Sequence, residues 1–184
     1  MSRIGAVVLA AGAATRFGSP KQKLLLPDVL SRLGEAVVEE VVVVEGAYRL
    51  SEDSTRARVR RVRCADWERG PGASLRCGLA TFADDVEAAV VILADGPRLA
   101  PAAVGRVIDS WRADGGDVVA ASYGGVRGHP LLLARARWGD VPDEGLRVVE
   151  PRLVPCDDLG VPGDVDTPED LAALEDDAGW RAAP

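Results

Sequence analysis

Three basic side chains stand close together in a glycine-containing segment near the start of this sequence. The segment "AAGAATRFGSPKQK" (residues 10–23) follows an apolar run and contains Arg16, Lys21 and Lys23. Its glycines allow a ligand to approach the backbone, and its N–H groups could form a nest that holds phosphate oxygens. The segment matches neither G-x-G-x-x-G nor G-x-x-x-x-G-K-[ST]. Taken alone, it indicates either a phosphate-binding loop or a strand-to-helix turn with solvated basic residues.

Two acidic segments supply side chains of the opposite charge. Asp95 follows an apolar run in "LADGPRL", and Asp164 and Asp166 stand in "PGDVDTPEDLAAL". Turn formation or helix capping is an equally good interpretation of Asp95, and Thr167 as an N-cap explains part of the second segment. A phosphate-binding loop with two carboxylate sites is nevertheless the arrangement that Mg²⁺-dependent chemistry on a triphosphate needs. Mg²⁺ takes few carboxylates and completes its shell with phosphate oxygens.

Buried strands alternating with helices must position these side chains. Short apolar, β-branched runs predict strands at residues 4–10, 40–45, 59–64, 88–94 and 117–122. The segments between them predict helices at residues 28–38, 74–82, 101–111 and 168–177. This alternation favours an α/β fold with a largely parallel sheet that is covered on both faces. Ligands of such sheets bind beyond the carboxyl ends of the strands, where the charged segments stand.

Length and charge narrow the class of protein. A chain of 184 residues with 47% hydrophobic residues can bury one sizeable core. We expect one domain over residues 1–175 and a polar C-terminal tail over residues 176–184 that frays. The net charge of −7 argues against general nucleic-acid binding, which requires clustered Lys and Arg. The arginine-rich stretch at residues 56–64 is interpreted as an edge strand with solvated arginines in preference to a docking surface for an anionic partner.

The cysteines and the N-terminal residues indicate the cellular compartment in which the protein is expected. Cys64, Cys77 and Cys156 are odd in number and form no C-x-x-C pair, and His129 is the only histidine. We therefore expect neither a disulfide framework nor structural zinc. Arg3, the apolar run and the small residues after it resemble a secretory signal peptide, but the chain lacks a disulfide pattern and an 18-residue apolar run. A cytoplasmic protein that does not span a membrane is the favoured interpretation.

Six motifs together resemble one known family of nucleotidyltransferases. In order along residues 4–174 they are "LAAGAATRFGSPK", "ADWERGPGASLRCGL", "LADGP", "GHPLLL", "DEGLR" and "GDVDTPEDL". The chain resembles the family that includes the molybdenum cofactor cytidylyltransferases and the molybdopterin guanylyltransferases. The resemblance implies a three-layer α/β/α sandwich with a mostly parallel, Rossmann-like sheet of the nucleotide-diphospho-sugar transferase type.

The resemblance also implies roles for particular residues in nucleotide and metal binding. The residues expected to bind the nucleotide are Leu9, Ala10, Ala11, Gly12, Arg16, Lys21, Gly72 and Ser74. In this family "LAAG" accompanies cytidine substrates, so Ala11 favours CTP. The catalytic residues are expected to be Arg16, a lysine and Asp95. The lysine is Lys21 when counted from Gly18 and Lys23 when counted back from "LLLP", and both remain candidates. Asp95 and either Asp164 or Asp166 are expected to bind Mg²⁺. Helix capping is the alternative role for Ser74.

The acceptor side is expected to include Arg76, His129 and Arg147, although Arg147 also fits a surface helix. In the implied reaction, an anionic phosphate of the acceptor attacks the α-phosphorus of CTP and pyrophosphate leaves, so no strong general base is required. The expected acceptor is molybdopterin or another small phosphorylated molecule, such as a sugar phosphate, and a molybdoenzyme is a further possible partner. The alternative is a non-catalytic relative that serves as a chaperone or regulator of such an enzyme.

Overall fold

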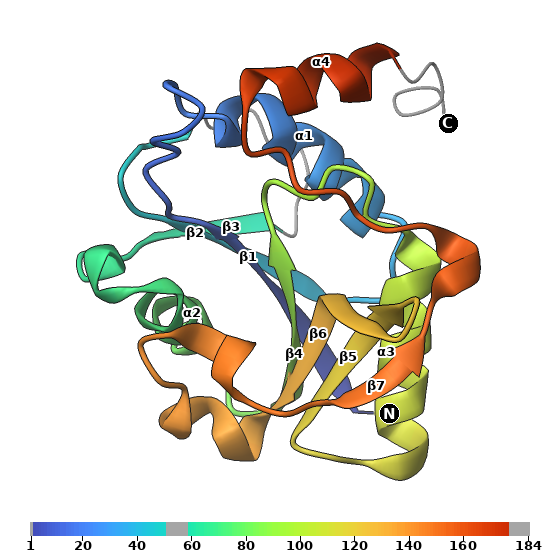
Figure 1. Ribbon diagram of the computed structural model, residues 1–184. Coiled ribbons are helices and arrows are strands. Elements are labelled where there is room, and N and C mark those ends of the chain that lie inside the picture. The colour runs from blue at the N-terminus through green and yellow to red at the C-terminus, as the bar shows by residue number, and fades with distance from the viewer. Residues whose placement is uncertain (1, 51–58, 177–184) are drawn as a thin grey trace.

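Seven strands form one mixed, mostly parallel sheet at the centre of the molecule (Figure 1). The computed structural model describes residues 2–50 and 59–176. The strands are β1 (Arg3–Ala10), β2 (Glu40–Glu45), β3 (Val59–Arg63), β4 (Val86–Leu93), β5 (Val118–Tyr123), β6 (Val126–Ala134) and β7 (Arg152–Pro155). Their order is β3-β2-β1-β4-β6-β5-β7, and only β6 runs antiparallel to its neighbours, β4 and β5. The predicted α/β class with a largely parallel sheet is confirmed.

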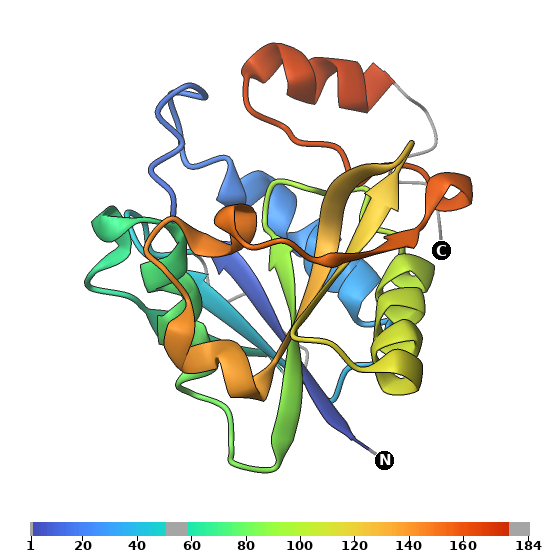
Figure 2. The same ribbon diagram turned by 60° about the horizontal axis from the view of Figure 1, so that its bottom comes forward.

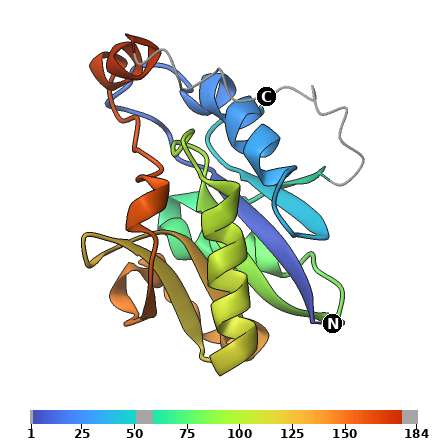
Figure 3. The same ribbon diagram turned by 90° about the vertical axis from the view of Figure 1, so that its right-hand side faces the viewer.

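Helices cover both faces of the sheet and make three layers. The helices are α1 (Gln22–Leu33), α2 (Pro71–Leu79), α3 (Pro101–Asp114) and α4 (Pro168–Asp176). Helices α1 and α3 lie on one face, and α2 lies on the other with short 3₁₀ turns, including η1 (Trp67–Arg69) and η3 (Gly145–Val148) (Figures 1 and 3). Helix α4 lies on the outer side of α1, where Leu25, Val165 and Leu174 form a small separate cluster (Figure 2). Among the residues described, no helix combines the length and apolarity needed to cross a membrane.

Alternate residues of the central strands fill two separate cores. Val8 of β1 packs in the core beneath α1 and α3, whereas its neighbour Val7 packs in the core beneath α2. Val7 pairs with Val42 of β2 and Val91 of β4 in register. Successive side chains of a strand point to opposite faces, so a strand buried on both faces must be apolar at every position. This is the reason that continuous apolar runs marked these strands in the sequence.

The strands β6 and β7 were not predicted. Strand β6 contains Arg127, Gly128, His129 and Pro130 in its first half, so its apolar run is confined to residues 131–134 and the strand shows no regular alternation. Strand β7 has only four residues. Both depend on pairing within the sheet, which no local pattern encodes. The predicted edge strand is confirmed at β3, where Arg60 lies 2.9 Å from Glu40; residues 56–58 lie outside the described residues.

Two helices begin earlier than predicted. Helix α1 starts at Gln22 and includes Pro27. The predicted helix started at residue 28, after this proline. Helix α2 starts at Pro71, a residue that fits the first helical turn because its missing N–H needs no partner there. Ser74 therefore lies inside α2 and is not its N-cap. The predicted tail at residues 176–184 lies, apart from Asp176, outside the described residues.

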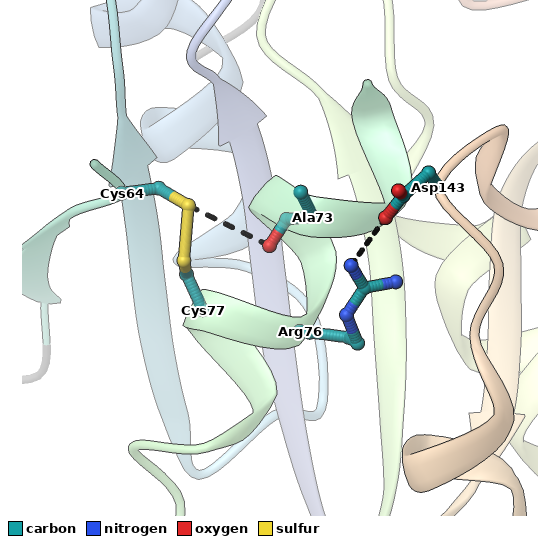
Figure 4. The surroundings of a disulfide bond; sticks show 5 residues. All are labelled: Cys64, Ala73, Arg76, Cys77 and Asp143. Atoms are coloured by element: carbon teal, nitrogen blue, oxygen red, sulfur yellow. Dashed lines mark hydrogen bonds and ion pairs between the residues drawn. A yellow bond between two sulfur atoms is a disulfide. The ribbon is translucent and has the colours of Figure 1, made fainter. Parts of the chain in front are cut away.

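The expectation of no disulfide is wrong. A disulfide joins Cys64, just after β3, to Cys77 on α2, with the Cα atoms 5.7 Å apart (Figure 4). The two cysteines are 13 residues apart and follow no recognised spacing. They meet because the chain turns back from β3 through η1 into α2, which the sequence pattern did not reveal. Cys156 is buried and free.

Candidate active site

The carboxyl ends of β1 and β4 open into a cavity of about 400 Å³. One side is formed by the loop after β1, including Gly12 and Arg16, and by Lys21 at the start of α1. Asp95, just after β4, and Asp166, just before α4, also line it. The predicted charged segments therefore meet at one edge of the sheet, as ligand sites in α/β proteins do.

The loop after β1 is held in a defined shape. Ala14 adopts a φ of 49°, and its carbonyl oxygen accepts hydrogen bonds from the N–H groups of Phe17 and Gly18. The side-chain amide of Gln22 donates to the carbonyl oxygen of Gly12 at 2.9 Å, and the Tyr48 hydroxyl donates to that of Ala13 at 3.1 Å. The loop is thus fixed from both α1 and the segment after β2 before any ligand is bound.

Lys21 is the buried cation of the site. Its ammonium nitrogen lies 2.9 Å from Oδ2 of Asp95 and 2.9 Å from Oδ1 of Asp166, and it donates to the carbonyl oxygen of Val165 at 2.6 Å. Burial by itself lowers the pKa of Lys21, but the two carboxylates outweigh burial and raise it above its usual range. The residue is therefore charged at neutral pH although it is only 6% exposed.

Asp166 also binds the second cation of the loop. Its Oδ2 lies 2.9 Å from the guanidinium of Arg16, whose side chain is largely exposed. The hydrogen bond from Lys21 and the charges of Lys21 and Arg16 hold the pKa of Asp166 below its usual range. One carboxylate therefore bridges two cations that, by the resemblance, would contact phosphate.

Asp95 and Asp164 are the carboxylates of the site that are candidates to hold a divalent cation. Oδ1 of Asp95 is buried and has no hydrogen-bond partner within the described ranges. Burial and the charges of Asp95 and Asp166 raise the pKa of Asp164, so a cation placed among these carboxylates would relieve their repulsion. The described residues contain no group of three or more metal-ligating side chains. Mg²⁺ fits such a site because it takes few protein carboxylates and completes its shell with phosphate oxygens.

The opposite wall of the cavity was only partly anticipated. It consists of Trp67 and Glu68 of η1, then Gly70, Pro71 and Ser74. Ser74 is 3% exposed and lines the cavity from within α2. Trp67 and Glu68 stand in the quoted motif "ADWERGPGASLRCGL", but sequence reasoning assigned them no role. The feature of the sequence that could have identified this wall is the aromatic residue Trp67 between a predicted strand and a predicted helix.

Four of the predicted site residues lie elsewhere. Ala10 is 3% exposed and packs in the core beneath α1 and α3. Lys23 is exposed and lines a small depression that does not include the carboxylates. Gly72 faces the loop after β6, since a Cβ atom there would lie 1.7 Å from the carbonyl oxygen of Pro142. Arg76 forms a half-buried ion pair with Asp143, which joins α2 to the segment after β6 (Figure 4). None of these four lines the cavity described above.

Two further cavities adjoin the first. One, of about 290 Å³, is mainly apolar and is lined by Leu75, Leu131, His129 and Arg147 among others. The other, of about 480 Å³, is lined by His129 and Asp164. Leu93 lines all three cavities, so they meet at the end of β4.

His129 is uncharged at neutral pH. Burial lowers its pKa to about 4; Asp95 opposes this shift and Arg127 adds to it. The guanidinium of Arg127 donates to the carbonyl oxygens of Leu146 and Val149, both at 2.6 Å. His129 is therefore suited to hydrogen bonding or packing beside these cavities.

Comparisons with known proteins identify the family of the chain. Residues 6–146 match the family described as the MobA-like NTP transferase domain. The crystal structure of Rv0371c from Mycobacterium tuberculosis H37Rv is 28% identical with a TM-score of 0.76, over 95% of this chain and 98% of that chain. A second structure of that protein, in complex with manganese, is 27% identical with a TM-score of 0.74, over 96% and 100% of the two chains.

A more distant structure shares the fold. A nucleotidyl transferase from Methanothermobacter thermautotroptrophicus is 21% identical with a TM-score of 0.74, over 96% of this chain and 97% of that chain. A search of curated proteins finds no match. The fold is the nucleotide-diphospho-sugar transferase-like sandwich that the motifs implied. On its matched residues, the chain belongs to the MobA-like NTP transferase family and is a nucleotidyltransferase of that family.

Proposed function

We propose that this nucleotidyltransferase moves CMP from CTP to a small phosphorylated acceptor and releases pyrophosphate. The observation that carries the proposal is the position of Lys21, buried 2.9 Å from both Asp95 and Asp166 beside the loop that follows β1. Arg16 shares Asp166 with it. A cavity with two converging cations and nearby carboxylates has the charges that a metal-bound triphosphate requires.

Arg16 and Lys21 would bind the phosphates. The Asp166 carboxylate forms ion pairs with both cations. Phosphate oxygens can replace it because they also carry negative charge and accept hydrogen bonds. Arg16 is exposed enough to turn toward a ligand, whereas Lys21 is already fixed. Asp95, with Asp164 or Asp166, would hold Mg²⁺, which neutralises charge on the phosphate oxygens when bound.

The acceptor would occupy the cavities beyond Leu93. Arg147 lines the apolar one and can pair with an acceptor phosphate. His129 borders both cavities as a neutral side chain. An anionic acceptor phosphate needs no strong base to attack, and neutral His129 is consistent with this reaction. Molybdopterin is the acceptor that the motifs favour, with a molybdoenzyme as the protein partner that would receive the product.

Ala11 supports the choice of CTP. It is the second alanine of "LAAG", and it lines the cavity at the end of β1. Calorimetry with CTP, GTP and ATP, each with and without Mg²⁺, tests the choice. We expect Mg²⁺-dependent binding of CTP at least about tenfold tighter than of GTP. Equal binding of the three nucleotides would contradict CTP specificity, and no binding at all would favour the non-catalytic alternative.

Asp95→Asn tests the metal site. The substitution keeps the size of the side chain and removes its charge, so pyrophosphate release should fall by at least about 10²-fold. Asp109→Asn on the exposed surface of α3 is the matched control and should retain full activity. Unchanged turnover of Asp95→Asn at saturating Mg²⁺ would rule out Asp95 as the metal ligand.

A further inference from the structure

The nucleotide cavity has two chemically different walls. Arg16 and Lys21 line it from the loop after β1 and the start of α1, and Trp67 and Pro71 line it from η1 and the start of α2. Helices α1 and α2 lie on opposite faces of the sheet (Figure 1). If the first wall holds the phosphates, as the proposed function states, the second wall faces the nucleoside. The inference below rests on that function.

Trp67 offers a flat apolar surface on this second wall. A Cβ atom on Gly46 would lie 2.6 Å from the Trp67 ring and 2.5 Å from the carbonyl oxygen of Ala11. The ring therefore packs directly against the backbone at Gly46, next to the loop that follows β1. Trp67 also lines the cavity. An aromatic ring stacks on a nucleobase whatever the base, since every base has a π-face.

The segment that carries Trp67 is fixed at both ends by the disulfide. Cys64 is fully buried, and its N–H donates to the carbonyl oxygen of Glu45 at 2.8 Å, which anchors it to β2. The bond to Cys77 then closes the chain around η1 and most of α2 (Figure 4). Arg69, two residues after Trp67, forms an ion pair with Asp143 at 3.0 Å. A segment restrained in this way loses little conformational entropy when a ligand binds.

We propose that Trp67 stacks on the base of the bound nucleotide and that the Cys64–Cys77 disulfide holds it in position. Trp67 is thus a substrate-binding residue, and Cys64 and Cys77 are positioning residues that act through it.

The test compares a ligand that has a base with one that has none. The probes are CTP and inorganic tripolyphosphate, titrated by calorimetry into the full chain at one fixed Mg²⁺ concentration. Trp67→Ala should bind CTP roughly tenfold more weakly or worse, and tripolyphosphate within about twofold of the unsubstituted protein. Trp67→Phe should restore most of the CTP affinity because it keeps an aromatic ring. Arg16→Ala should weaken both probes.

Tryptophan fluorescence gives a second readout. CTP should quench part of the emission and tripolyphosphate should not. The quenching should vanish in Trp67→Phe and persist in the control Trp111→Phe, because Trp111 lies on α3 with its N–H bonded to the carbonyl oxygen of Gly116. Quenching that survives in Trp67→Phe would overturn the stacking role.

The disulfide is tested by Cys77→Ser, which leaves Cys64 as a buried thiol. This variant should lose CTP affinity and keep tripolyphosphate affinity, as Trp67→Ala does, while its circular dichroism spectrum shows an intact fold. CTP affinity equal to that of the unsubstituted protein would overturn the positioning role. If Trp67→Ala weakens both probes equally or neither, the stacking role is wrong. Unsubstituted protein that binds neither probe would instead contradict the proposed function.

Discussion

The ammonium nitrogen of Lys21 lies 2.9 Å from Oδ2 of Asp95, which connects the start of α1 to the end of β4. The backbone strengthens this connection, because the N–H of Val165 donates to the carbonyl oxygen of Asp95 at 3.1 Å and the carbonyl oxygen of Val165 accepts from Lys21 at 2.6 Å. Three segments that are distant in the sequence are thereby joined at the candidate active site.

Lys21 and Lys23 are predicted to differ sharply in function. Lys21→Ala removes the buried cation and should lower pyrophosphate release by about 10²–10³-fold, the loss typical of removing one group that stabilises transition-state charge. Lys23→Ala is the matched control: its side chain is exposed and lines a different depression, so its rate should stay within about twofold. Steady-state kinetics on the two variants checks this, and the reverse order of effects would make Lys23 the catalytic lysine.

Substitution of Arg76 should lower the stability of the fold, whereas substitution of Arg147 should weaken acceptor binding. Arg76 donates to the carbonyl oxygen of Val141 and pairs with Asp143, so Arg76→Ala should lower the midpoint of urea unfolding and leave the KM for acceptor within about twofold. Arg147 lines the apolar cavity, so Arg147→Ala should raise that KM roughly tenfold or more, as expected for loss of a charged hydrogen bond. A raised acceptor KM in Arg76→Ala alone would restore the role first expected of Arg76.

Mild acid should destabilise the protein through His129. Its pKa is about 4 in the folded protein and 6.5 in the unfolded chain, so between these values the unfolded chain binds the extra proton. The free energy of unfolding should therefore fall as the pH drops from 7 to 5, by about 2 kcal/mol from this group. Urea unfolding of the unsubstituted protein and of His129→Gln at both pH values isolates the contribution. An equal pH dependence in the two proteins would show that His129 does not cause it.

The disulfide predicts a thiol count and a stability difference. Alkylation of the denatured chain without reductant should modify one cysteine, Cys156, and all three after reduction. Because the bond closes a 13-residue separation, Cys77→Ser should unfold at a free energy about 3 kcal/mol lower, in the loop-entropy model. Mass spectrometry and urea unfolding supply these measurements. Three reactive thiols before reduction would mean that the bond does not form.

Local patterns were sufficient for five of the strands and for the positions of the charged segments. A strand segment covered on both faces requires consecutive apolar residues, and residues 4–10 of β1, 41–44 of β2 and 88–93 of β4 meet that requirement. Strand β6 does not, because His129 and Pro130 interrupt it, and its place between β4 and β5 depends on pairing with them. The same limit applies to Cys64 and Cys77, whose proximity depends on the course of the chain through η1.

The sequence by itself determined the α/β class, the family resemblance and the types of side chain at the sheet edge, since these depend on local periodicity and on ordered motifs. Only the tertiary structure decided which of two neighbouring lysines enters the site. Lys21 and Lys23 are almost equivalent along the chain, but the start of α1 at Gln22 buries Lys21 between two carboxylates and leaves Lys23 exposed. It likewise placed Gly72, expected to bind the nucleotide, outside the cavity and Trp67 in its wall, because contacts between distant segments determine which residues face the cavity.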